Sequence, residues 1–192
     1  MKDPLLIDVP TEILSPRLSI RAPRAGDGAA VNEAVLESFP ELHRWMPWAR
    51  TRPTLAESEI FVRSGVSDFA RRTVLPMLIC DRHSQQLVGA SGLHSIDWNV
   101  PKFEIGYWCR TPLAGRGYVR EAAGAIARMA FERLGAARVE IRTDVRNERS
   151  WRVAERLGFT LEGTLRADMR APGGELRDTR VYALTSLADL RD

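Results

Sequence analysis

The spacing of hydrophobic and polar residues changes twice between Lys102 and Glu121, and the rest of the chain is organised around this stretch. Residues 103–109 alternate and are rich in aromatic side chains, which is typical of a strand. Residues 111–117 contain one proline and two glycines and predict a loop. From Tyr118 onward, apolar residues recur every three or four positions, as they do on one face of a helix. The predicted unit is therefore a strand, a glycine-rich loop and a helix.

The start of this predicted helix has the composition of a phosphate-binding site. Gly115, Arg116 and Gly117 lie where backbone N–H groups are unpaired and the helix dipole is positive, so an anion is favoured there. Glycine lets the backbone approach a diphosphate closely. Arg120 falls in the first helical turn, where the dipole disfavours a cation unless an anion lies nearby. The alternative is a tight turn with solvated arginines, since short glycine motifs often match by chance.

The remaining segments predict a single domain over residues 1–192, with an α/β (α+β) fold. The strand–helix–strand passage from 103 to 143 needs a right-handed crossover, so its two strands should be parallel and the other pairs antiparallel. Gly89 and Gly92 are expected to mark a bulge or a close backbone approach. Other strands are expected at 15–22, 74–80, 86–95, 138–143, 159–169 and 177–185, and other helices at 27–39, 54–72 and 150–157.

Two of these segments carry more specific expectations. The helix at 54–72 begins with Thr54 and Glu57 in a capping-box pattern. Its apolar face is expected to comprise Ile60, Phe61, Val62, Val66 and Phe69. Residues 40–48 are rich in aromatic side chains between two prolines and predict a loop. This loop is either a hydrophobic plug or one wall of a substrate pocket.

Composition narrows the class of protein. The chain has 192 residues, and its net charge of +3 is too small for a dedicated nucleic-acid binder. The two cysteines and three histidines show neither a disulfide framework nor metal-ligand spacing. No signal peptide and no membrane-spanning apolar run are apparent. We therefore expect a cytoplasmic protein without a metal.

In order and spacing, these segments resemble the GNAT superfamily of N-acetyltransferases, and within it the RimJ/RimL-like branch of ribosomal-protein N-terminal acetyltransferases. The resemblance covers nearly the whole chain. The matching pieces are Arg17-Leu18-x-Ile20-Arg21, Trp45-Met46-Pro47-Trp48, Phe103-Glu104-Ile105-Gly106-Tyr107-Trp108, Gly115-Arg116-Gly117-Tyr118 with Glu121-Ala122, Asn147-x-x-Ser150, and Leu157-Gly158-Phe159-x-x-Glu162-Gly163.

The resemblance implies a mixed, mostly antiparallel sheet with helices on both faces. The sheet would splay between the strands at 103–109 and 138–143, with acetyl-CoA in the opening and a backbone N–H near Cys109 facing the thioester oxygen. The implied cofactor-binding residues are Tyr107, Trp108, Cys109, Gly115, Arg116, Gly117, Tyr118, Val119, Arg120, Asn147 and Ser150.

The chain departs from the family pattern at two places. The phosphate motif usually begins with Gln or Arg and ends with Gly or Ala, whereas this chain has Pro112 or Ala114 at the first position and Val119 at the last. Many relatives carry a tyrosine acid in the short helix after the asparagine, where this chain has Ala154.

The implied reaction is attack of an amine on the acetyl thioester, and the acceptor sets how much help it needs. An α-amine titrates at about 7.7–8.0 and is about one-tenth neutral at pH 7, whereas a lysine amine titrates at about 10.4. Glu104 is the candidate base, acting through a water, because it is the only acid in its strand. The alternative is a structural ion pair. Ser150 is the candidate for assisting the leaving thiolate, although it is also a natural helix N-cap.

The favoured acceptor is the N-terminal α-amine of a protein, with a pocket built from residues 40–53, 54–72 and 166–180. A small-molecule amine acetyltransferase, of antibiotic or polyamine type, remains an alternative because fold does not fix substrate. A non-catalytic acyl-CoA or RNA-associated binding module is a third. The sequence gives no sign of membrane association and places nucleic acid near the protein only through a ribosomal substrate. A homodimer is common in this branch.

Overall fold

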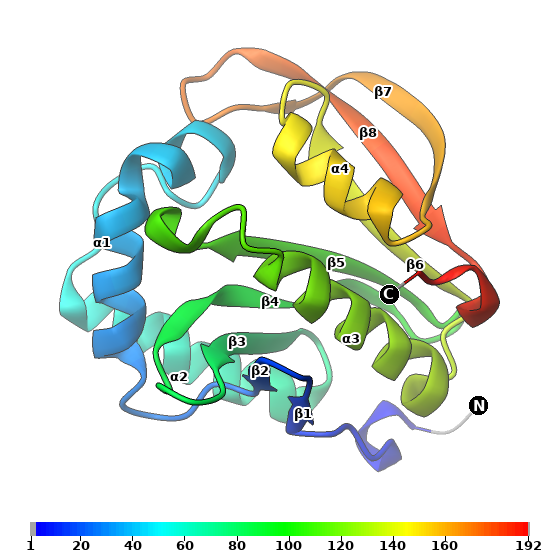
Figure 1. Cartoon of the computed structure of the whole chain (residues 1–192), viewed down its shortest axis with the longest axis horizontal. Coiled ribbons are helices and arrows are strands. Elements are labelled where there is room, and N and C mark those ends of the chain that lie inside the picture. The colour runs from blue at the N-terminus through cyan, green and yellow to red at the C-terminus, as the bar shows by residue number, and fades with distance from the viewer. Residues whose placement is uncertain (1–2, 192) are drawn as a thin grey trace.

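The computed structural model describes residues 3–191, which form one eight-stranded mixed sheet and four α-helices (Figure 1). Neighbouring strands follow the order β1-β2-β3-β4-β5-β6-β8-β7. The helices are α1 (Gly28–Trp45), α2 (Leu55–Arg71), α3 (Tyr118–Leu134) and α4 (Glu148–Arg156). The strands are β1 (Glu12–Leu14), β2 (Leu18–Arg21), β3 (Leu75–Asp81), β4 (Leu87–Asp97), β5 (Lys102–Cys109), β6 (Arg138–Asp144), β7 (Thr160–Arg170) and β8 (Leu176–Leu184).

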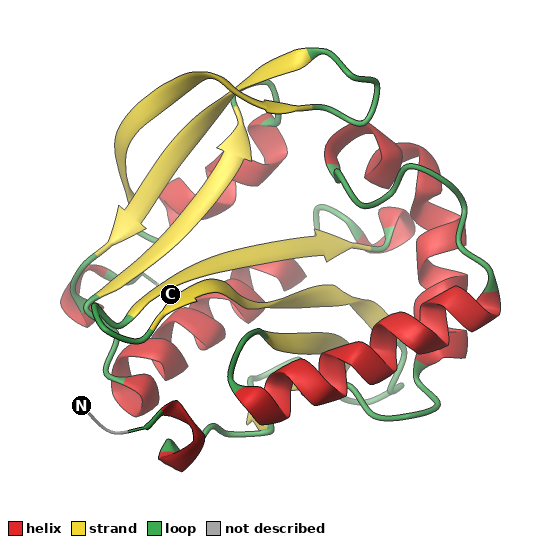
Figure 2. Ribbon diagram, turned by 180° about the vertical axis from the view of Figure 1, so that it is seen from behind, coloured by secondary structure: helices red, strands yellow, loops and turns green. Residues whose placement is uncertain are grey.

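Helices cover both faces of the sheet, as predicted. α3 and α4 lie on one face and α1 and α2 on the other (Figures 1 and 2). The strands alternate accordingly, so that Phe103 and Ile105 of β5 join a core cluster with Ile126 of α3. The opposite side of the sheet contributes Leu78 to a second cluster with Val35 of α1. The two core clusters therefore lie mainly on opposite faces of the sheet.

The sheet opens between β5 and β6. These strands are parallel, as the crossover argument predicts, but pair only at Lys102↔Arg138, Phe103↔Val139 and Glu104↔Glu140. Residues 105–109 continue β5 against β4 alone, while β6 pairs with β8 through six residue pairs. Figure 2 shows the two parts of the sheet diverging from their common end. The predicted splay is confirmed.

The hairpin of β3 and β4 confirms the role expected of its glycines. A Cβ on Gly89 would collide with the carbonyl of Trp108, and one on Gly92 with the carbonyl of Leu75. The ladder between β3 and β4 also shifts register between Ile79 and Cys80. The strand therefore contains both a bulge-like irregularity and close backbone approaches.

The predicted loop at 40–48 is wrong for its first half, because α1 continues through Pro40 to Trp45. A proline inside a helix removes one backbone hydrogen bond. Tertiary contacts compensate for that lost hydrogen bond. Leu42 is buried, and the chain after β5 hydrogen-bonds to the helical turn that precedes Pro40. There the Thr111 N–H donates to Ser38 Oγ at 3.0 Å.

Helix α2 confirms its capping box and corrects its apolar face. Thr54 and Glu57 make both reciprocal hydrogen bonds. Val62 is buried, whereas Ile60 and Phe61 are 64% and 62% exposed. Of the other expected core positions, Phe69 is buried and Val66 is exposed. The stripe that contacts the sheet is thus narrower than the run of apolar residues.

The first predicted strand, residues 15–22, corresponds to β2 alone, and β1, which the sequence did not predict, precedes it. Leu18 and Ile20 of β2 are fully buried, as expected. The segment before it turns at Ser15, whose N–H donates to the Leu18 carbonyl, and β1 pairs antiparallel with β2. Within residues 3–191, the structure contains no helix long and apolar enough to cross a membrane.

Candidate functional site

The loop before α3 exposes a helix N-terminus. Gly115 and Gly117 adopt left-handed conformations with φ of 80° and 81°, which favour glycine. Gly117 is the N-cap of α3, and no side chain caps the first turn. The first N–H groups of α3 therefore remain available to an anion, and the dipole of a 17-residue helix adds to the attraction.

An arginine that the sequence argument did not single out as functional holds this loop in place. Arg17, in the turn between β1 and β2, pairs its Nε with Glu121 Oε2 at 2.6 Å. Its Nη1 donates to the Arg116 carbonyl at 2.9 Å, and its guanidinium lies 4.6 Å from the centre of the Tyr118 ring. The turn is thereby fixed to residues 111–117, the candidate phosphate-binding loop, which we call the phosphate loop. Arg17 is part of the family motif, but its contact with Glu121 could not be predicted from the sequence because the two residues are 104 positions apart.

Glu121 is the acceptor at the centre of this contact. Burial alone would raise the pKa of Glu121, but hydrogen bonds from Ser15 Oγ, the Arg17 N–H and the Arg17 side chain outweigh it, and the pKa lies below its usual range. Glu121 therefore stays ionised at neutral pH. A carboxylate in the first helical turn also complements the dipole.

A second contact joins the two sides of the opening between β5 and β6. Tyr107 Oη, on β5, donates to the Ser150 carbonyl of α4 at 2.9 Å. Ser150 Oγ lies 3.3 Å from the same phenol oxygen. Burial raises the pKa of Tyr107, so this phenol keeps its proton. The structure thus brings Tyr107 and Ser150 together beside the opening.

Ser150 is not the N-cap of α4. Asn147 occupies that position, and its Oδ1 accepts from the Ser150 N–H at 3.2 Å. Asparagine is at least as good an N-cap as serine. α4 therefore begins at Glu148, two residues before the predicted start at Ser150. The Ser150 hydroxyl is consequently free of a capping role and points to Tyr107.

Glu104 lies on the other face of β5, away from Tyr107. Its side chain is 18% exposed, and Oε1 is 3.9 Å from Nε2 of His94 on β4. Glu104 is also directly opposite Glu140 of β6 at the last pair before the strands diverge. Trp108, on the same face, packs at 6.4 Å from Trp48. The predicted residues therefore line the opening from both faces of the sheet.

Cys109 ends β5 beside the phosphate loop. Its thiol is half-buried, and burial raises its pKa to about 11. It is therefore protonated at neutral pH, which makes it a poor nucleophile.

Two of the three walls expected for the acceptor pocket meet in the structure. Arg177 of β8 donates to the Trp45 carbonyl at the end of α1, at 3.4 Å. Arg142 of β6 pairs with Asp168 of β7 at 3.2 Å. Arg180, expected in the same hairpin wall, instead lies on the opposite face, 4.5 Å from the Trp151 ring. The charges of the hairpin are thus divided between the two faces of the sheet.

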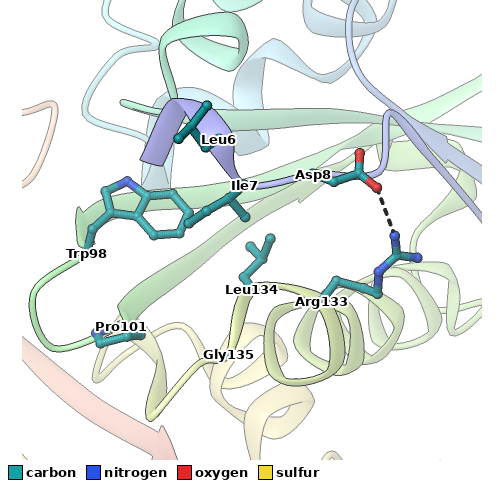
Figure 3. A pocket seen from close by; sticks show the side chains of 8 residues that line it. All are labelled: Leu6, Ile7, Asp8, Trp98, Pro101, Arg133, Leu134 and Gly135. Atoms are coloured by element: carbon teal, nitrogen blue, oxygen red, sulfur yellow. Dashed lines mark hydrogen bonds and ion pairs between the residues drawn. The ribbon is translucent and has the colours of Figure 1, made fainter. Parts of the chain in front are cut away.

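Two cavities flank α3. One, of about 720 Å³, adjoins the phosphate loop and is lined in part by Gly117, Arg120 and Gly124. The other, of about 490 Å³, lies at the opposite end of the helix (Figure 3). There Asp8 and Arg133 face each other at 3.2 Å beside Trp98. The second cavity contains none of the predicted site residues.

Comparisons with known proteins agree with this geometry. Residues 17–160 match the family model described as an acetyltransferase (GNAT) domain. A protein of Bacillus subtilis (strain 168) that carries the name "Putative ribosomal N-acetyltransferase YdaF" is 29% identical over 161 residues, which cover 81% of this chain and 85% of that protein.

Solved structures share the fold. The ribosomal L7/L12 alpha-N-protein acetyltransferase RimL, in complex with coenzyme A, superposes with a TM-score of 0.84 at 24% identity, covering 94% of this chain and 99% of that one. The microcin C7 self-immunity acetyltransferase MccE, in complex with acetyl-CoA and AMP, gives 0.85 at 22% identity, covering 93% and 98%.

The Glu121 contact makes the stability of the fold depend on pH. Because its pKa is depressed in the folded protein, its stabilisation is present above the unfolded pKa and is lost as the pH falls through the folded value. We expect Glu121→Gln to lower the free energy of unfolding at pH 7 by on the order of 1 kcal/mol, and the difference to shrink below about pH 4.

Urea unfolding monitored by circular dichroism across this range measures the effect. Glu132→Gln, on the same helix, is the control, since Glu132 is exposed and makes only a 3.9 Å surface pair with Arg128. Equal losses in the two variants, or a pH-independent loss in Glu121→Gln, would contradict the assignment.

Proposed function

The chain belongs to the GNAT acetyltransferase family and is an acetyl-CoA-dependent N-acetyltransferase, and we propose that its acceptor is the N-terminal α-amine of a protein. One observation carries the assignment of the site. The pairing of β5 with β6 ends at Glu104, so the free edge of β5 lies between the phosphate loop and the candidate base. A donor bound along that edge would meet an acceptor held on the Glu104 side.

The donor half of the site would use backbone groups more than side chains. The N-terminus of α3, with Gly115, Arg116 and Gly117, would hold the diphosphate, and Arg120 would add positive charge. Tyr118 and Val119 would contribute their backbone N–H groups in the first turn. Residues 105–109 of β5, which are largely half-buried, would offer backbone groups that β6 does not pair to the amide-containing arm of the donor.

The chemistry divides between the two sides of the opening. On one side Glu104 would take the proton of the acceptor amine through a water as the nitrogen attacks the acetyl carbon. The backbone N–H near Cys109 would stabilise the oxygen of the tetrahedral intermediate. As the carbon–sulfur bond breaks, the Ser150 hydroxyl would hydrogen-bond the departing thiolate. Tyr107 would hold Ser150 in place rather than donate a proton, because its pKa is raised.

The ease of this proton transfer favours an α-amine over a lysine amine. About one-tenth of an α-amine is already neutral at pH 7, so it needs less help from a base than a lysine amine does. The likeness to a protein named as a ribosomal N-acetyltransferase supports the same class of acceptor. A ribosomal acceptor would place the reaction in the cytoplasm. MccE shares the fold equally well. Because a fold does not fix its substrate, small amines are the competing acceptor class.

The acceptor class is tested by direct competition. We expect acetylation of short peptides with a free α-amine to exceed that of the same peptides carrying a blocked N-terminus and an internal lysine, measured by mass spectrometry with saturating acetyl-CoA. Polyamines and aminoglycosides serve as the small-amine arm. Preferential acetylation of either small amine would replace the protein acceptor with that class.

The phosphate loop is tested by cofactor binding. A thermal melt should show stabilisation by acetyl-CoA, by about 2.7 kcal/mol at a hundred times the Kd. Gly117→Glu should abolish the shift, because it places charge and bulk at the diphosphate and a side chain at a φ of 81°. Gly163→Glu on β7, where a Cβ meets nothing within 4 Å, is the control. A normal shift in Gly117→Glu would disprove this placement of the diphosphate.

The role of Glu104 is tested by the pH profile. Glu104→Gln should lower kcat/KM for the peptide most at low pH, where nearly all of the amine is protonated and a base is needed. The effect should fade towards about pH 9, where the amine is already neutral. Identical profiles for Glu104→Gln and the wild type between about pH 6 and pH 9 would remove Glu104 as the base.

A further inference from the structure

His94 is placed opposite the candidate base by the ladder between β4 and β5. The two residues are a cross-strand pair, and His94 Nε2 lies 3.9 Å from Glu104 Oε1. Side chains that are directly opposite in an antiparallel pair share one face of the sheet. His94 therefore lies on the acceptor side, where Glu104 would receive a proton. Its side chain is 40% exposed, whereas that of Glu104 is 18% exposed.

Two local features hold the imidazole in this position. Gly106, two residues after Glu104, leaves the space that the ring occupies, since a Cβ there would lie 2.8 Å from His94 Nε2. Ser95 follows His94 with a φ of 49°, unusual for a residue other than glycine, at the register shift between β4 and β5. Ser95 Oγ lies 3.1 Å from His94 Nδ1. Such irregularities can redirect a side chain next to a functional site.

We propose that His94 is the proton acceptor behind Glu104, and that the pair carries the proton of the acceptor ammonium out of the site to solvent. This inference rests on the proposed function. The ammonium loses one proton before attack and a second as the amide forms, while the sulfur leaves as the thiolate. Each proton goes to the Glu104 carboxylate, passes to the unprotonated Nε2 of His94 once the 3.9 Å separation of the two groups closes to hydrogen-bond distance, and then enters water from the exposed edge of the ring. The carboxylate and the neutral imidazole are regenerated, so nothing is oxidised or reduced.

The chemistry of the two groups explains why a carboxylate would benefit from an imidazole behind it. Model carboxyls titrate about 3.5 pH units below an α-amine, so the proton moves uphill by that amount when a carboxylate takes it alone. A model imidazole titrates only about 1.3 units below the amine. Relaying the proton to an imidazole thus removes most of the mismatch and also returns the base to its charged form.

The charged residues around Glu104 and His94 are paired with other groups, so Glu104 and His94 interact with each other. Glu140, opposite Glu104 on β6, accepts from Arg138 Nε at 2.6 Å. Arg138 also binds Glu162 of β7 through two hydrogen bonds. Further along β6 and β7, Arg142 pairs with Asp168. Where β4 ends and β5 begins, Asp97 of β4 lies opposite Lys102 of β5. The Glu140 carboxylate beside Glu104 already has an arginine partner, whereas Glu104 pairs with His94.

The test is the pH dependence of kcat/KM for a peptide α-amine with His94→Gln. The variant should use only amine that is already neutral in solution, so its kcat/KM should fall tenfold per pH unit below about pH 7.7. We expect it to match the wild type near pH 9 and to be about tenfold slower at pH 7. His83→Gln, in the exposed turn after β3, is the matched control and should follow the wild-type profile.

A second variant separates proton transfer from packing. His94→Ala should regain activity at pH 7 when imidazole is added to the buffer, because the ring position is partly open to solvent. Gly106→Ala should reproduce the His94→Gln profile by displacing the ring. Acetyl-CoA should still raise the melting temperature of all three variants, which reports an intact fold and donor site.

The outcomes distinguish a failure of the proposed acceptor from a failure of the proton relay. A wild-type enzyme that binds acetyl-CoA but acetylates no α-amine would overturn the proposed acceptor. An active wild type whose pH profile His94→Gln leaves unchanged would overturn the relay alone and leave the acceptor in place. A pH-independent loss in His94→Gln, without rescue by imidazole, would reduce His94 to a packing role and likewise overturn the relay.

Discussion

The parallel pairing between β5 and β6 is only three residues long, and the site depends on this limit. On either side of it the sheet is extensively paired, through β4 for β5 and through β8 for β6. The two parts must therefore diverge as the right-handed twist of each accumulates. The divergence leaves a strand edge inside the protein, and buried backbone groups without partners are unfavourable. An extended molecule with amide groups is the kind of ligand that such an edge accepts.

Contacts across the opening keep it from closing or spreading. The Tyr107–Ser150 contact ties β5 to α4 on one face of the sheet. Arg177 reaches the end of α1 on the other face. Near the loop, Arg17 joins the N-terminal strands to the first turn of α3. These three contacts link elements that are distant in the sequence, and the first two join the parts of the structure on either side of the opening.

The sequence predicted the parts of the fold that depend on local patterns. The strand at 103–109, the glycine loop and α3 follow from alternation, turn residues and helical spacing. The capping box of α2 follows from two residues three positions apart. β1 was missed because three residues are too few to show a period. The extension of α1 through Pro40 was missed because contacts from the chain after β5 override the local preference.

The same distinction applies to the site. The glycines of the loop and the lone acid of β5 could be recognised from their neighbours in the sequence. The partner of Arg17 is 104 residues away in the sequence, and the partner of His94 lies across a strand pair. No local sequence pattern therefore reveals either contact. The sequence suggests Ser150 as an N-cap because serine suits that position, whereas Asn147 is the N-cap of α4 in the structure.

Strand β7 differs from the rest of the sheet in that all of its residues are exposed. It is held by its ladder with β8 and by ion pairs such as those of Arg138 with Glu162 and Arg142 with Asp168. A strand with so little buried apolar surface opens locally at a lower free energy than the core, and salt screens its ion pairs. Substitutions there disturb the fold least. If the β7–β8 hairpin forms a wall of the acceptor pocket, as proposed, substitutions in β7 would change acceptor preference at little cost to the fold, whereas the loop before α3 is joined to a helix with a buried face.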